Sequence, residues 1–371
     1  KILSALDKPT YKFSMRDIAR EAGVSVSAVS LALRNSPKVS KKRRAEIAKI
    51  AQRMGYVKDG RISELMEHLR TNRTDRQFSK LAVLIPEISK AQLTSFPVTH
   101  KLMTGMEAQA YDSGYELDVF YLPELKASPK RLRNILISRG IQGIIAMPWV
   151  SGVGTLDLDI DAFCISTAGY SIIDPMVNRA CTNYLQMMDE LIEQACRLGY
   201  QRIGFVMTYP RGGIGHKLFA SSYLYYSSLI EESRRIPILP KSKISPETVA
   251  GWMKEYEPDV VISDGAVYQI LVELGYKIPE DMGFAALDTA KGPDDASGVD
   301  HRHDVVGREA FKLVLSDLAL NSKGIPDSPK VVLVDSHYQT GSTLRRVGQT
   351  LDVRIRSATY HDSDGAVTLV K

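Results

Sequence analysis

Residues 14–35 read SMRDIAREAGVSVSAVSLALRN, and this stretch decides the fold of the first part of the chain. Ser14 is a favourable N-cap for a first helix, whose apolar positions, from Ile18 onward, recur at helical spacing. Gly23 allows the left-handed turn that ends this helix, and Ser25 is the N-cap of a second one. The stretch therefore predicts two short helices joined by a tight turn, which is a helix-turn-helix motif.

A third helix is expected after the break at residues 35–37, which read Asn-Ser-Pro. Ser40 is its predicted N-cap, and apolar residues from Ile47 onward form its inward face. Its first turn carries the basic run Lys-Lys-Arg-Arg at 41–44. We expect this run to face phosphate groups.

The charge of the chain is divided unevenly between its two ends. Residues 1–76 hold 18 lysines and arginines against 8 acidic residues, whereas residues 77–371 hold 30 against 35. A basic head on a mildly acidic body is typical of a module that replaces counterions along a nucleic acid. At 371 residues the chain is long enough for two or three domains.

Composition favours a cytoplasmic protein. No run of 18 apolar residues is long enough to span a bilayer, so no membrane insertion is expected. The three cysteines Cys164, Cys181 and Cys196 cannot all pair within one chain, and we expect Cys164 and Cys181 to be small buried apolar residues. The carboxylates within 157–161 alternate with apolar residues, which favours a polar-edged strand or loop over a metal site. No metal and no cofactor are expected.

From Lys80 onward, short apolar runs alternate with helical patterns, and the rhythm restarts near residue 199. Continuous apolar strands bounded by helices predict parallel strands covered on both faces, with ligands at their carboxyl ends. The fold expected for this part is an α/β body of two doubly wound parallel-sheet subdomains. Its predicted strands are 81–86, 115–121, 141–147, 199–206, 258–264 and 282–288.

The pattern A-G-V-S-x-x-x-V-S at 22–30, then V-S-x-x-x-R at 39–44 and G-Y at 55–56, resembles the headpiece of the LacI/GalR family of bacterial transcription regulators. Phrases such as G-Y-Q-R-I-G-F-V at 199–206 extend the resemblance over residues 80–345. The family's body resembles a periplasmic sugar-binding protein. The resemblance thus implies a homodimer that binds double-stranded operator DNA, with a small-molecule effector, a carbohydrate, held between the two subdomains.

By resemblance, the second helix reads bases and the residues around it contact the DNA backbone. Leu31 is unusual at a base-reading position: an apolar side chain either contacts a feature such as a thymine methyl or packs on the body and reads nothing. The residues expected to contact DNA are Ser14, Ser25, Val26, Ser27, Ser30, Leu31, Arg34, Ser40, Arg43 and Leu65.

Leu65 lies where the family has a leucine that enters the minor groove from a short hinge helix. Ile62, Leu65, Met66 and Leu69 form an apolar stripe at helical spacing, so a helix from Arg61 onward is expected. The stripe serves either as a wedge between base steps or as a dimer seam.

The resemblance also implies an effector site at the strand ends. Asp288 matches an aspartate that accepts hydrogen bonds from ligand hydroxyls, and His301 falls where a glutamine is frequent. Phe219 stands in place of the arginine usual in the family, with Lys217 or His216 as substitutes, which weakens the case for a sugar. The expected ligand-binding residues are Ser166, Lys217, Ser263, Asp288 and His301.

These observations predict a sequence-specific transcription regulator, a repressor, that is not an enzyme. The alternative is a sugar-binding module without regulatory DNA binding. The expected domains are a headpiece (1–60), a hinge and linker (61–79), an effector-binding and dimerisation body (80–345) and a C-terminal extension (346–371).

Overall fold

The structure is a computed structural model of the chain. It describes residues 15–33, 39–54, 79–207, 213–240 and 244–351. Several sequence predictions lie outside these residues: those for Ser14, Arg34 and the hinge stripe with Leu65, and that for the end of the chain after residue 351.

The headpiece consists of three helices, α1 (Met15–Ala22), α2 (Val26–Leu33) and α3 (Lys41–Arg53). Ile18, Val29 and Ile47, one from each helix, are fully buried against one another. Gly23 has a φ of +62°, the left-handed conformation that the turn requires. The predicted helix-turn-helix is therefore confirmed.

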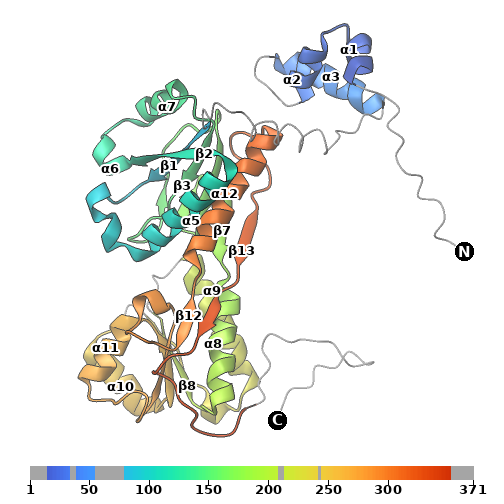
Figure 1. Ribbon diagram of the computed structural model, residues 1–371. Helices are drawn as coiled ribbons and strands as arrows, with labels where there is room; N and C mark the ends of the chain where they lie inside the picture. The colour runs from blue at the N-terminus through green and yellow to red at the C-terminus, as the bar shows by residue number, and fades with distance from the viewer. Residues whose placement is uncertain (1–14, 34–38, 55–78, 208–212, 241–243, 352–371) are drawn as a thin grey trace, which may run out of the picture.

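The body contains two subdomains, which lie one above the other in Figure 1. In the first subdomain all pairings of the six-stranded sheet are parallel, in the order β13-β7-β5-β3-β1-β2. Its elements are β1 (Ser79–Ile85), η1 (Lys90–Ser95), α5 (Pro97–Ser113), β2 (Tyr115–Tyr121), α6 (Leu122–Leu125), α7 (Pro129–Ser138), β3 (Gly143–Ala146), β4 (Gly154–Thr155), β5 (Cys164–Ala168), β6 (Ile172–Asp174), β7 (Asn178–Thr182), α12 (His303–Leu320) and β13 (Val331–Val334).

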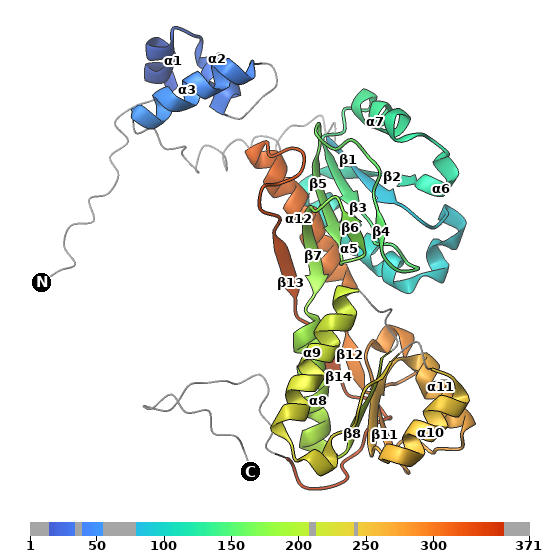
Figure 2. The same ribbon diagram turned by 180° about the vertical axis from the view of Figure 1, so that it is seen from behind.

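The second subdomain repeats this plan with the order β14-β12-β11-β10-β8-β9, and only β14 pairs antiparallel. Seen from behind in Figure 2, α8 and α9 lie on one side of its sheet and α10 and α11 on the other. Its elements are α8 (Tyr184–Leu198), β8 (Ile203–Met207), α9 (Ile214–Leu229), η2 (Glu232–Arg234), β9 (Leu239–Pro240), α10 (Pro246–Tyr256), β10 (Val260–Ser263), α11 (Gly265–Glu273), β11 (Gly283–Ala286), η4 (Thr289–Lys291), β12 (Gly298–Asp300) and β14 (His337–Gln339).

Alternation along the strands explains why both faces of each sheet are covered. In β1, Leu81 and Val83 pack under α5 and α12, whereas Ala82 and Leu84 face α7. Successive side chains of a strand point to opposite faces, so a wholly apolar strand requires a helical layer on each side. The predicted fold class, a helical headpiece and two parallel-sheet subdomains, is confirmed.

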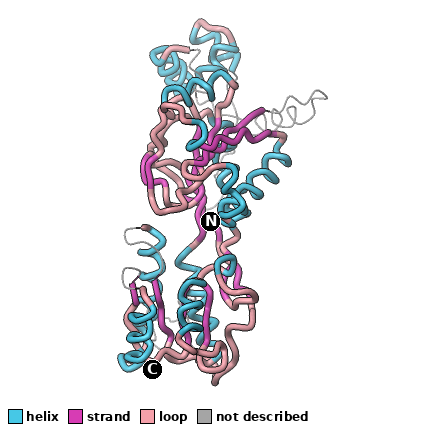
Figure 3. The backbone as a smooth tube through the Cα atoms, turned by 90° about the vertical axis from the view of Figure 1, so that its left-hand side faces the viewer, coloured by secondary structure: helices cyan, strands magenta, loops and turns pink. Residues whose placement is uncertain are grey.

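The chain passes between the subdomains three times, near residues 183, 301 and 335, and Figure 3 shows the two lobes end to end. Hydrogen bonds tie the three passages together. Asn183 Nδ2 donates to Asp335 Oδ1 at 2.8 Å, and the Thr182 hydroxyl donates to the His301 carbonyl oxygen at 3.4 Å. Passages of this kind are where hinge motion between two lobes is concentrated.

Helix α9 begins at Ile214, directly after Gly213, whose backbone is extended. Cys164 and Cys181 are buried, as predicted, and all three cysteines are free. Within the described residues, no helix combines the length and the apolar character needed to cross a membrane.

Candidate DNA interface and effector site

Of the three serines predicted to cap headpiece helices, Ser25 and Ser40 do so, and Ser14 lies outside the described residues. The Ser25 hydroxyl oxygen accepts from Ala28 N at 3.1 Å, and the Ser40 hydroxyl oxygen accepts from Arg43 N at 3.3 Å. These bonds satisfy amide groups that the first turn of a helix leaves unpaired. The starts of α2 and α3 are thereby fixed.

The start of α2 presents an apolar side chain to solvent. Val26 is 42% exposed, whereas Leu31, further along the helix, is half-buried. Ser27 and Ser30 lie on α2, but the structure does not describe their side chains. An exposed valine at the beginning of the second helix fits a surface that another molecule covers.

The basic residues of α3 divide into two kinds. Lys41 and Lys42 are exposed. Arg43, in contrast, donates to the Ala22 carbonyl oxygen at 2.8 Å and pairs with Glu46 at 2.8 Å, so it also joins α3 to the end of α1. A guanidinium has five N–H donors, which leaves some for a phosphate.

In the body, three buried polar side chains converge beyond the carboxyl ends of β11 and β12. They are Asp288, which follows β11, and His301 and His303, which follow β12. Their ligand atoms all lie within 4.8 Å of one another, and His303 Nε2 is 3.8 Å from Asp288 Oδ2. The exposed fractions are 2% for Asp288, 1% for His301 and 8% for His303.

Burial and charge set the protonation of this cluster. Burial raises the pKa of Asp288, but the adjacent His301 and His303 outweigh it and hold that pKa well below its usual value. Burial lowers the pKa of His301 to about 4, against the opposing effect of Asp288. Asp288 is therefore a carboxylate and His301 a neutral imidazole near neutral pH.

Aromatic rings form one wall of the cluster. Tyr184, at the start of α8, lies edge-on to His301 with ring centroids 6.1 Å apart, and edge-on to Phe219 at 4.9 Å. Tyr170, which follows β5 in the first subdomain, lies 6.1 Å from Tyr184. The wall thus contains side chains from both subdomains.

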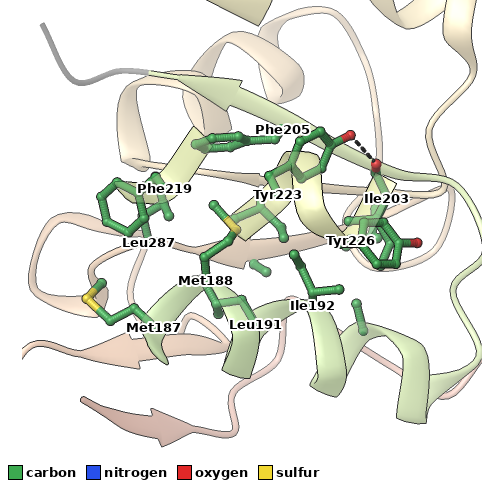
Figure 4. Packing of buried hydrophobic residues seen from close by; sticks show 14 of the residues in the cluster. Met187, Met188, Leu191, Ile192, Ile203, Phe205, Phe219, Tyr223, Tyr226 and Leu287 are labelled. Carbon is green, nitrogen blue, oxygen red and sulfur yellow. Dashed lines mark hydrogen bonds between the residues drawn. The ribbon is translucent and has the colours of Figure 1, made fainter. Parts of the chain in front are cut away.

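Phe219 belongs to the core rather than to a polar binding surface. It is fully buried in the cluster that joins α8 and α9 to the sheet, and Figure 4 shows it beside Leu287 in that cluster. Lys217, two residues earlier on α9, is exposed. Lys217 and His216 are the two residues expected to substitute for the arginine, and of these the structure describes the side chain of Lys217.

Two of the expected ligand-binding serines are occupied within the protein. Ser166 is fully buried in β5, and its hydroxyl donates to the Ala310 carbonyl oxygen on α12 at 2.7 Å. The Ser166 hydroxyl therefore holds a helix against the sheet and is not available to a ligand. Ser263 is also fully buried, and its hydroxyl donates to the Val206 carbonyl oxygen at 2.9 Å. The backbone carbonyl oxygen of Ser263 accepts from Leu287 N at 2.7 Å, which positions the residue before Asp288.

A pocket of about 610 Å³ lies at the opposite edge of the second sheet. Arg202, Asp259 and Met282, which line it, immediately precede β8, β10 and β11. Asp259 is held there by the amides of Gln201 and Arg202. In open parallel sheets ligands bind at the carboxyl ends of strands, so the cluster at Asp288 is the better candidate.

Sequence reasoning missed His303 and Tyr184. The nearness of His303 to Asp288 depends on how β12 leads into α12. Tyr184 directly follows the passage between the lobes at residue 183. A single aromatic residue at that position forms no recognisable sequence pattern. Both follow the end of a strand, β12 and β7 respectively, and that position was the available signal.

The chain combines a helix-turn-helix headpiece with two α/β lobes, and buried carboxylate and imidazole side chains lie where the lobes meet. This combination defines a class of proteins that have a DNA-binding part and a ligand-binding part. Residues 14–59 match the family model described as "Bacterial regulatory proteins, lacI family". The match covers the headpiece, which is thus a DNA-binding domain of the lacI-family type.

One curated relative is similar to part of the chain. The HTH-type transcriptional repressor CytR of Escherichia coli (strain K12) is 25% identical over 134 residues. The match covers 36% of this chain and 35% of the repressor, so it spans about a third of either protein.

Solved structures share the fold at low identity. The transcriptional regulator CelR, solved as a cellobiose complex, is 14% identical, and the match covers 90% of this chain and 100% of that one with a TM-score of 0.51. A transcription regulator like protein from Staphylococcus haemolyticus is 15% identical, with 71% and 98% coverage and a TM-score of 0.52. These likenesses concern the fold alone.

Proposed function

We propose that the chain is a sequence-specific DNA-binding transcription regulator, a repressor, that acts in the cytoplasm as a homodimer on a near-palindromic operator. The observation that carries the proposal is the lacI-family headpiece, with its exposed α2 start and basic α3, on a two-lobed body. One headpiece buries too little surface for high specificity, and two dyad-related headpieces remove that limit.

We further propose that a small-molecule effector binds where the two lobes meet. Support comes from Asp288 and His301 at the strand ends and from the three chain passages between the lobes. A carbohydrate is the class suggested by the CelR–cellobiose complex, although Phe219 stands in place of the arginine usual in the family. The chemistry proposed is binding, with no enzymatic turnover.

The proposed domains are the headpiece (1–60), the hinge and linker (61–79), the body (80–345) and the extension (346–371). The described parts are compatible with this division, because α3 ends at Arg53 and β1 begins at Ser79. The first residues of the extension bond to the end of α8, where Leu351 N donates to the Cys196 carbonyl oxygen at 2.9 Å.

Selection from random duplex DNA tests the proposal. The full chain is expected to enrich a motif with two-fold symmetry, and recovery of no such motif would refute a dimeric regulator. The same selection with residues 77–371 is the control and should enrich nothing. If the shortened chain keeps every biological activity of the full chain, the alternative of a binding module without regulatory DNA binding is correct.

A further inference from the structure

The cluster beyond β11 and β12 has three buried polar atoms that lack hydrogen-bond partners: Asp288 Oδ2, His301 Nδ1 and His303 Nε2. Buried polar atoms in folded proteins are almost always hydrogen-bonded, so each exception calls for an explanation. Here all three belong to a single cluster, and they include a carboxylate oxygen and two imidazole nitrogens. Such convergence is typical of atoms that share a ligand.

Two of the three side chains are oriented through their other polar atom. Asp288 Oδ1 accepts from Ala290 N at 3.0 Å, and this bond leaves Oδ2 directed elsewhere. His301 Nε2 lies 2.8 Å from the Leu287 carbonyl oxygen. A carbonyl oxygen can only accept, so Nε2 carries the proton and Nδ1 of the neutral ring keeps its lone pair.

This is the arrangement that metal sites use to fix a histidine. A ligating imidazole donates its second N–H to a backbone carbonyl or a carboxylate, which sets its tautomer and its direction. His303, the first residue of α12, places its ring 4.9 Å from that of His301. The two rings therefore approach the carboxylate from neighbouring positions on the same passage between lobes.

We propose that Asp288, His301 and His303 form a binding site for a divalent transition-metal ion of the zinc type. Two imidazoles and one carboxylate suit such an ion, whereas calcium and magnesium prefer shells made of oxygen. Three protein ligands leave the fourth tetrahedral position for water or for an oxygen of a small molecule.

Geometry limits how the site would close. Metal–ligand bonds of about 2.0–2.1 Å place the ligand atoms of a tetrahedral site roughly 3.4 Å apart. The 3.8 Å between His303 Nε2 and Asp288 Oδ2 is close to this value, and the wider separations in the cluster, up to 4.8 Å, must shorten. Because His303 begins α12 of the first subdomain and Asp288 follows β11 of the second, a bound ion would link the two subdomains at their junction.

The sequence predicts no metal site, because the carboxylates of its acidic run at 157–161 alternate with apolar residues. In the structure that run is a surface loop whose Asp157, Asp159 and Asp161 are exposed. The proposed metal site shares Asp288 and His301 with the proposed effector site, but metal binding is measured without DNA or effector, so the two proposals are tested separately.

The test uses the untagged full-length protein, stripped with a chelator and titrated with Co²⁺ alone. We expect one ion per chain with the intense visible absorption of tetrahedral cobalt, and displacement of that absorption by Zn²⁺. The variants H303Q, H301Q and D288N should each weaken binding by at least about 10- to 100-fold, the loss that even an outer-shell partner causes. H100Q, at an exposed histidine on α5, is the matched control and should bind as the unaltered chain does.

Circular dichroism of each variant checks that it is folded. His303 is the least buried of the three residues, so H303Q is the variant that should disturb folding least. Absence of a stoichiometric cobalt band, or a band that H303Q leaves unchanged, would overturn the proposal. The second result means an adventitious ion only. Since operator selection does not depend on this titration, failure here leaves the regulator proposal standing, and failure of operator selection leaves the metal site standing.

Discussion

Phe219 stands where the resemblance implies an arginine, and its surroundings explain why a charge cannot replace it. Its ring packs 4.9 Å from Tyr184 and 6.5 Å from Phe205 in a fully buried cluster. An unpaired guanidinium there would lose its hydration without gaining a counter-ion.

We therefore expect Phe219→Ala to lower the free energy of unfolding by about 3–5 kcal/mol, because it removes a buried ring and leaves a cavity. Leu224→Ala on the same helix is the control, since Leu224 is 57% exposed and its loss should change stability by less than about 0.5 kcal/mol. Denaturant unfolding followed by near-ultraviolet circular dichroism measures both. Equal effects of the two substitutions would contradict the assignment of Phe219 to the core.

Asp288 offers a second prediction at the scale of one residue. Asp288→Asn preserves the shape of the side chain and the bond from Ala290 N, but removes the negative charge. Operator affinity, measured by fluorescence anisotropy with and without each sugar of a panel that includes cellobiose, should lose its dependence on the effector. Affinity without a sugar should stay as it was. An unchanged dose–response would remove Asp288 from the effector site.

At the scale of elements, the crossing of α5 and α12 holds the first subdomain together. A Cβ atom at Gly307 would lie 2.1 Å from the Leu102 carbonyl oxygen, and one at Gly105 would lie 1.8 Å from that of Asp304. The two helices approach through backbone at both points. Glycine is required there because no larger residue allows this distance.

We expect Gly307→Ala to lower the free energy of unfolding by about 1–3 kcal/mol or more, because α5 and α12 must separate. Gly251→Ala on α10 is the matched control: its Cβ meets nothing within 4 Å, and alanine in a helix should stabilise by about 0.5–1 kcal/mol. Thermal unfolding of both variants distinguishes steric contact from helix propensity. If both proteins were stabilised, the close crossing would be refuted.

At the scale of the whole molecule, charge segregation determines how the protein meets DNA. The first 76 residues carry the basic excess, and the remaining residues carry a small acidic excess. A negative body is repelled by phosphate, which leaves contact to the headpiece.

Operator affinity should consequently fall steeply with salt, by about 10³-fold or more between roughly 50 and 200 mM if two headpieces make six or more phosphate contacts. Replacing the exposed pair Lys41 and Lys42 by alanine should reduce the slope of log affinity against log salt. Lys254→Ala on α10, also exposed, removes a charge from the body and should leave that slope unchanged. A slope unaffected by the headpiece pair would show that α3 does not face phosphate.

Features of this chain that depend on nearby residues could be predicted from its sequence, and features that depend on distant residues could not. The headpiece, the caps at Ser25 and Ser40 and the wholly apolar strands were predictable, because each depends on residues a few positions apart. Ser166 and Phe219 were not, since their roles depend on α12 and on the core between α8 and α9. A serine at a strand end has the same appearance in a sequence whether it faces a ligand or a helix.

The opening stretch at 14–35 thus determined a helix-turn-helix by itself, because helical periodicity, a left-handed glycine and serine caps act over single turns. Only the tertiary structure decided which polar residues meet. Asp288, His301 and His303 come together because the ends of β11 and β12 are neighbours in a parallel sheet and the chain then turns into α12. Strand neighbours are set by packing and pairing across the whole sheet, and no local pattern encodes that distance.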